Sequence, residues 1–132
     1  MKTVVIIMGS VVDGPHVEKI IAKLDSSAVR VENYVASAHK QPMDVLKIID
    51  DYKDHQSVVF ITVAGRSNAL SGFVAANTTF PVIACPPFSD TIDMLVNIHS
   101  TLQMPSEVPV LTVLGPRNAA LAALRILALA RQ

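Results

Sequence analysis

The chain has 132 residues, of which 51% are hydrophobic, and its eleven basic residues balance its eleven acidic ones. Balanced charge without a basic run argues against a nucleic-acid partner, and the single cysteine, Cys85, excludes an internal disulfide and suits a reducing compartment. No leader or long apolar segment follows Met1, so we expect one cytoplasmic domain over residues 1–132 that binds no membrane.

The first predicted elements are two strands with a helix between them. Residues 3–8 are continuously apolar, as in a central strand, whereas residues 29–35 alternate, as in a less central one. Between the two strands, residues 16–24 carry apolar side chains at helical spacing. After a loop over residues 36–40, Pro42 opens the next helix, because a residue without an N–H suits the first helical turn.

Residues 58–72 read as a strand, a polar turn and the start of a helix. Residues 58–63 are unbroken and apolar, which is typical of a strand buried on both faces. The turn that follows leaves free backbone N–H groups for a ligand. Ser67 or Asn68 is also a candidate helix cap, but a cap leaves the Arg66 guanidinium unexplained. We interpret the turn as one wall of an anion-binding site and expect Arg66 to fix its shape.

Two more strands and two more helices complete the pattern. Residues 80–85 and 108–114 predict strands, and Pro109 indicates that the second is an edge strand. Residues 90–102 and 117–131 predict helices.

The last helix is apolar almost all round, since Arg125 is its only polar side chain between Asn118 and Arg131. Such a helix cannot rest one face on a sheet and expose the other to water. We expect the second face, including Ala123 and Leu127, to pack on a neighbouring subunit of a symmetric homo-oligomer.

Five strands alternating with five helices predict the α/β class. The expected architecture is a three-layer α/β/α sandwich around a doubly wound, parallel, five-stranded sheet in the order 2-1-3-4-5. Ligands of such sheets bind beyond the carboxyl ends of the strands, at the switch point between strands 1 and 3. The loops over residues 9–13, 37–40 and 65–68 therefore converge on one crevice.

The side chains that meet there are two hydroxyls, one carboxylate, one imidazole and two cations: Ser10, Ser37, Asp13, His39, Lys40 and Arg66. The cations and hydroxyls suit a phosphate or carboxylate. Asp13 suits the hydroxyls of a ribose, and His39 is the natural proton carrier. Plain structural roles remain open: Ser10 and Asp13 as caps, Lys40 as a surface charge, and His39 as a loop residue without a task.

Other chemistries find no support in the sequence. His16, His55 and His99 share no metal-ligand spacing with Cys85, so we assign no metal site. Cys85 ends an apolar strand and is expected to be a buried small residue. Neither a phosphate-binding P-loop nor a dinucleotide fingerprint is present, and we expect no cofactor.

Four segments carry a resemblance to a known family: MGSVVD at 8–13, SAHK at 37–40, VAGRSNALSG at 63–72 and CPPFSD at 85–90. Together they resemble the aminoimidazole ribonucleotide carboxylases of purine biosynthesis along nearly the whole chain. One branch of that family is a mutase, and the other adds carbon dioxide to the imidazole ring directly, without ATP or biotin. The chain is similar to the second branch in its SAHK, AGRSN and CPP segments.

The resemblance implies a role for each matched residue. His39 is implied as the proton carrier, Asp13 as the ribose ligand, and Ser37 and Lys40 as the phosphate ligands. The group implied to hold carbon dioxide or the new carboxylate comprises Ser10, Ala64, Gly65, Arg66, Ser67 and Asn68. The family usually has a phosphate-binding serine where this chain has Val12.

The resemblance further implies an octamer with active sites near subunit boundaries. The alternatives are the mutase of the same family and, in a different class, a non-catalytic phosphosugar-binding module.

Overall fold

The computed structural model describes residues 1–131 and contains the predicted five-stranded parallel sheet, with the strands in the order β2-β1-β3-β4-β5. The strands are β1 (Lys2–Met8), β2 (Arg30–Val35), β3 (Ser57–Val63), β4 (Val82–Ala84) and β5 (Leu111–Thr112). This is the doubly wound, flavodoxin-like order, in which the chain reverses direction across the sheet between β1 and β3.

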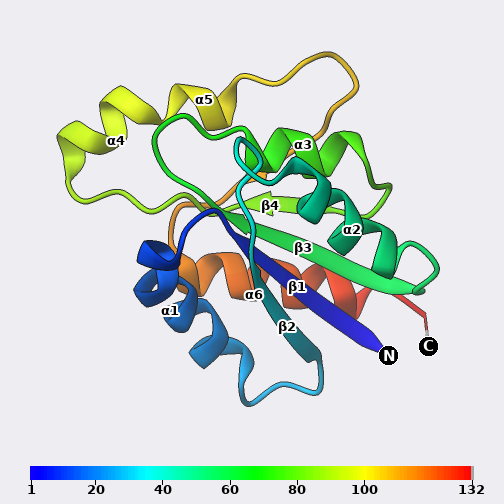
Figure 1. Cartoon of the computed structure of the whole chain (residues 1–132). Coiled ribbons are helices and arrows are strands. Elements are labelled where there is room, and N and C mark those ends of the chain that lie inside the picture. The colour runs from blue at the N-terminus through cyan, green and yellow to red at the C-terminus, as the bar shows by residue number, and fades with distance from the viewer. Residues whose placement is uncertain (132) are drawn as a thin grey trace.

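Helices cover both faces of the sheet, as Figure 1 shows. One core lies between the sheet and helices α1 and α6, and the other lies between the sheet and α2 and α3. The helical elements are η1 (Val11–Asp13), α1 (Gly14–Leu24), α2 (Pro42–Tyr52), α3 (Leu70–Ala76), α4 (Thr91–Asn97), α5 (His99–Leu102) and α6 (Pro116–Ala128). The predicted three-layer sandwich is confirmed.

The two central strands end side by side. All seven residues of β3 are buried, because alternate side chains enter the two cores. β1 pairs with β3 in register as far as Met8 and Val63, and the N–H of Gly9 then donates to the Val63 carbonyl at 3.0 Å. The loops that follow β1 and β3 therefore leave the sheet at the same level, as the switch-point argument requires.

The helix predicted over residues 90–102 is broken into α4 and α5 at Ile98. The Ser100 hydroxyl of α5 bonds to the backbone of the loop after β3, and the Thr101 hydroxyl bonds to Asn68. The sequence alone gives no sign of this break, because the partners lie more than 30 residues away.

The strand predicted over residues 108–114 shrinks to Leu111–Thr112. Its partner β4 has only three residues, two of which, Ile83 and Ala84, pair with β5. Pro109 has no N–H to donate to a ladder. The predicted edge position of this strand is confirmed.

The prediction for the outward face of α6 is wrong in its choice of residues. Ala123 is 0% exposed and Leu127 is 3% exposed, and both belong to the core that α6 shares with α1 and the sheet. Because α6 packs on α1 as well as on the sheet, more of its surface is buried than the single row of side chains that would contact a sheet alone. The outward side instead presents Leu121 and Arg125, which line a shallow groove with Asn118 and Ala122.

Candidate functional site

A cavity of about 330 Å³ opens beyond the carboxyl ends of β1 and β3. Twelve residues line it: Gly9, Ser10, Val12, Asp13, Ser37, His39, Ala64, Gly65, Arg66, Ser67, Pro87 and Asp93. The three loops predicted to converge thus do meet at one cavity. The side chains of Lys40 and Asn68, both predicted ligands, do not line it.

The wall after β1 is built on a short helical turn. The Ser10 hydroxyl accepts a hydrogen bond from the Val12 N–H at 3.3 Å, so Ser10 caps η1 while it faces the cavity. Burial raises the pKa of Asp13 above its usual range, and the backbone contact with Ser10 only partly opposes this. A partly desolvated carboxylate is a strong acceptor for hydroxyl donors such as those of a ribose. The Val12 side chain is 78% exposed at the rim.

His39 is held against the opposite wall. Its Nε2 lies 3.0 Å from the carbonyl oxygen of Ser67, and because a carbonyl can only accept, Nε2–H is the donor. The lone pair of the neutral ring is then on Nδ1, the nitrogen able to take up a proton while this bond persists. Nearby, the Ser37 hydroxyl accepts from the Lys40 N–H at 3.2 Å, and the Lys40 side chain is exposed.

The turn after β3 has an unusual backbone. Arg66 has a φ of 47°, in the left-handed region that side chains with a Cβ seldom adopt. A Cβ on Gly65 would lie 2.9 Å from the Pro87 carbonyl oxygen, so only glycine allows the two segments to approach this closely. The expectation that the Arg66 guanidinium fixes the turn is not supported. The hydroxyl of Ser100 bonds to the turn backbone instead, and Arg66 is exposed.

Asn68 has a structural role in this arrangement. Its Oδ1 accepts from the N–H groups of Leu70 and Ser71 at the start of α3, at 3.0 and 3.3 Å. Its Nδ2 donates to the hydroxyls of Ser71 and Thr101, at 2.9 and 3.0 Å. Asn68 is therefore a helix cap rather than a ligand-binding residue. Its side chain is buried, and its four hydrogen bonds all go to protein groups.

Sequence reasoning missed two lining residues from the segment after β4. Pro87 lies in the CPPFSD segment, whose residues carry no predicted ligand role. Asp93 of α4 faces Arg66 across the rim, and the Ser89 N–H and the Asn97 amide hold the pKa of its carboxylate low. The predicted strand order could have indicated both residues. Because β3 and β4 are parallel neighbours, the segment after β4 leaves the sheet beside the loop after β3.

A histidine–cysteine contact was also missed. The Nε2 of His16 lies 3.3 Å from the Sγ of Cys85, which is fully buried. Burial raises the pKa of the Cys85 thiol to about 12, so the sulfur stays protonated at neutral pH and is no nucleophile. The predicted structural role of Cys85 stands, with the added function of joining α1 to the end of β4.

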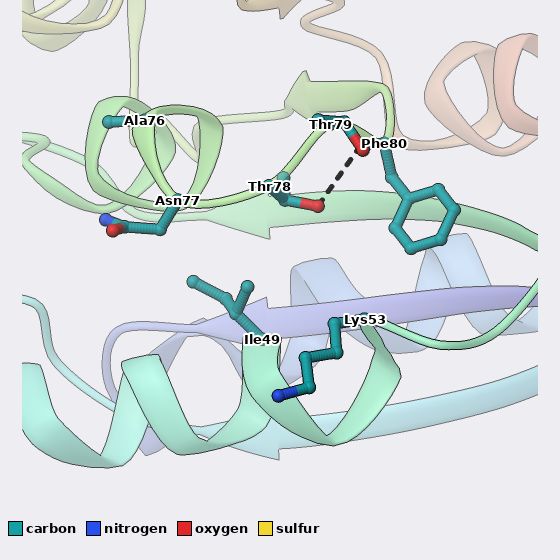
Figure 2. A pocket seen from close by; sticks show the side chains of 7 residues that line it. All are labelled: Ile49, Lys53, Ala76, Asn77, Thr78, Thr79 and Phe80. Carbon is teal, nitrogen blue, oxygen red and sulfur yellow. Dashed lines mark hydrogen bonds between the residues drawn. The ribbon is translucent and has the colours of Figure 1, made fainter.

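A second cavity, of about 380 Å³, lies near the amino-terminal end of β4, at the opposite ends of the strands from the first cavity (Figure 2). Three of its four polar side chains, those of Asn77, Thr78 and Lys53, are engaged with their own neighbours. The Asn77 amide donates to the Phe73 carbonyl, Thr78 Oγ1 accepts from the Phe80 N–H, and Lys53 pairs with Asp50 at 3.1 Å. The cavity beside His39 is therefore the stronger candidate.

Two negative findings concern residues 1–131. Their His, Cys, Asp and Glu side chains form no group of three that could hold a metal ion. Over the same residues, no helix is sufficiently long and apolar to cross a membrane.

Comparison with known proteins gives consistent matches along the chain. The model of the AIR carboxylase family matches residues 3–132. The phosphoribosylaminoimidazole carboxylase of Archaeoglobus fulgidus is 52% identical over 125 residues, covering 95% of this chain and 68% of the relative. The enzyme of the same name from Treponema denticola is 42% identical, covering 96% and 79%.

An animal relative and a solved structure extend the comparison. The bifunctional phosphoribosylaminoimidazole carboxylase/succinocarboxamide synthetase of Drosophila melanogaster is 45% identical over 96% of this chain, which spans 29% of that protein. The crystal structure of PurE from Treponema denticola superposes with a TM-score of 0.90 at 41% identity, covering 98% of this chain and 82% of that one.

Proposed function

The chain belongs to the AIR carboxylase family, and from this premise we propose that it adds carbon dioxide to the imidazole ring of 5-aminoimidazole ribonucleotide in purine biosynthesis. The product is the 4-carboxylated ribonucleotide, and the reaction is reversible. The observation that carries the proposal is the cavity in which His39 faces the turn after β3, because it combines a proton carrier with a backbone suited to a small carboxylate.

The reaction needs positioning and one proton transfer. The aminoimidazole ring is electron-rich, and its carbon next to the amine-bearing one attacks the carbon of CO₂ to form the new C–C bond. The proton on that ring carbon then leaves to the lone pair of His39, and the ring regains its aromatic electrons. Proximity and a general base supply the acceleration, so we propose that ATP, biotin and metal take no part.

The rest of the cavity suits the remainder of the substrate. We assign the ribose hydroxyls to Asp13, whose carboxylate is partly desolvated. We assign the phosphate to Ser37 and Lys40, which lie in the loop beyond the carboxyl end of β2. Ser10 and the backbone of residues 64–68 are assigned to the carboxylate. Lys40 has to swing inward for this role, which its exposed and flexible side chain allows.

Assembly and location belong to the same proposal. We propose that residues 1–132 act as one nucleotide-binding domain, in the cytoplasm, within a homo-oligomer for which an octamer is favoured. The support for the oligomer is the apolar surface of this chain. Ile92, Leu95 and Val96 of α4 are all exposed, and Leu121 of α6 lines an outward groove.

The decisive experiment is an ultraviolet assay of carboxylation of 5-aminoimidazole ribonucleotide with bicarbonate present and ATP absent. We expect turnover that rises with the concentration of dissolved CO₂. The matched arm supplies the N-carboxylated ribonucleotide without added bicarbonate, under conditions that remove free CO₂. Turnover only in the second arm would identify a mutase. Turnover in neither arm would favour the non-catalytic phosphosugar-binding module.

A further inference from the structure

The hydroxyl of Ser100 bridges the two ends of the turn that faces His39. Its Oγ accepts from the Asn68 N–H at 2.9 Å and donates its proton to the Arg66 carbonyl oxygen, which is nearer than its other acceptor, the Asn97 carbonyl oxygen at 3.2 Å. Ser100 lies on α5, 32 residues further along the chain than Asn68. One side chain from a distant element thus satisfies a donor and an acceptor of the turn at once.

The residue enclosed by those two bonds is Ser67. The Ser67 carbonyl is the acceptor for His39 Nε2 at 3.0 Å. Because the Arg66 carbonyl belongs to the peptide before Ser67 and the Asn68 N–H to the peptide after it, Ser100 fixes both peptide planes of Ser67. The second of these planes contains the carbonyl that orients the imidazole.

The backbone of this turn needs stabilising contacts from outside the turn. Arg66 has a φ of 47°, which a residue with a side chain keeps only when its surroundings impose it. Asn68 and Thr101 add a second link between the turn and α5 through their buried side chains, at 3.0 Å. Ser100 lies two residues after the break at Ile98, which separates α5 from α4.

From these contacts we infer that Ser100 is a positioning residue: through the Ser67 carbonyl it sets the orientation and tautomer of His39. The inference rests on the proposed function, in which His39 carries the proton. It predicts that loss of the Ser100 hydroxyl impairs the chemical step more than the binding of the ribonucleotide, whose ribose and phosphate are assigned to other loops.

The test compares Ser100→Ala with Ser100→Thr, which keeps the hydroxyl, and with Ser27→Ala as a matched control. Ser27 also donates its hydroxyl to a carbonyl, that of Leu24, but at the end of α1 and away from the cavity. The readouts are kcat and KM for the ribonucleotide at saturating bicarbonate, and ¹⁵N NMR of the His39 ring, assigned by its loss in His39→Asn.

We expect Ser100→Ala to lower kcat about tenfold or more with KM within about threefold of wild type. The share of the ring protonated on Nε2 falls in the same variant, Ser100→Thr restores both readouts, and Ser27→Ala changes neither. A folded Ser100→Ala protein with wild-type kcat or an unchanged ring tautomer overturns the inference.

If Ser100→Ala does not fold, Ser100→Cys replaces it, since the thiol keeps the size but is a weak donor. A folded Ser100→Cys protein with wild-type kcat overturns the inference, and failure of both variants to fold shows a role in folding instead. If wild type itself does not turn over, the proposed function fails, and the NMR comparison still decides whether Ser100 orients His39.

Discussion

The imidazole of His16 lies 3.3 Å from the thiol of Cys85, joining the first turns of α1 to the residue that follows β4. α1 follows directly on the wall that carries Ser10 and Asp13, and Cys85 begins the segment that carries Pro87. This contact therefore ties together two sides of the cavity without touching it.

The first prediction concerns pH and the stability of this contact. Burial, aided by the charge of Lys19, lowers the pKa of His16 below its usual value near 6.5. Below pH 6.5 the unfolded chain binds a proton that the folded chain still excludes, so the free energy of unfolding decreases as the pH falls. We expect the urea midpoint to drop between pH 7.5 and 5.5, and to drop less in His16→Gln, which keeps an N–H donor without titrating.

The second prediction is that His39→Asn removes turnover and keeps binding. Asparagine can still donate a hydrogen bond to a carbonyl but cannot take up and release a proton at neutral pH, so we expect kcat to fall at least ~100-fold. Calorimetric affinity for the ribonucleotide should stay near that of wild type. A variant with more than about a third of wild-type kcat would remove His39 from the role of proton carrier.

The third prediction is a gain of affinity. Val12 lines the cavity rim where the family usually has a phosphate-binding serine, and its side chain is 78% exposed. Val12→Ser adds a hydroxyl donor for an anion, and we expect KM for the ribonucleotide to fall up to about tenfold.

The control for this prediction is Val11→Ser, because Val11 is 74% exposed but does not line the cavity. Equal effects of the two substitutions would show that the hydroxyl does not meet the phosphate. The same comparison with a phosphate-free nucleoside should show no gain for Val12→Ser.

The fourth prediction tests the close approach of two walls. Gly65→Ala places a Cβ 2.9 Å from the Pro87 carbonyl oxygen, and neither backbone segment moves without shifting the cavity. We expect a loss of about 1–3 kcal/mol in the free energy of unfolding, the usual result of overpacking, and a reduced kcat. Gly14→Ala is the matched control, since a Cβ there meets no atom within 4 Å.

The fifth prediction separates folding from assembly on α6. Leu121→Glu places a charge on the outward groove, so we expect a folded protein that sediments as a smaller species and has little activity. Ala123→Glu places the same charge in a core position that is 0% exposed, so we expect it to prevent folding. A Leu121→Glu protein with wild-type size and activity would show that this groove is no subunit interface.

The class of fold, the strand order and the position of the candidate cavity could all be predicted from the sequence. Continuous apolar runs such as residues 58–63 are typical of strands buried on both faces, and with their short length and β-branched residues they indicate the central strands without any knowledge of partners. Alternation of strands and helices then leaves few topologies, and the switch point follows from topology alone. His39 could be found in this way because its loop lies at the end of a predictable strand.

Which side chains face the cavity and which support its walls depends on tertiary contacts. Asn68 lies in the recognised turn but points into a buried network, while Ser100, His16 and Asp93 act from segments with no motif of their own. The break at Ile98 and the burial of Ala123 have the same origin. Each depends on contacts between residues far apart in sequence, and local periodicity records the faces of an element but not which neighbours they meet.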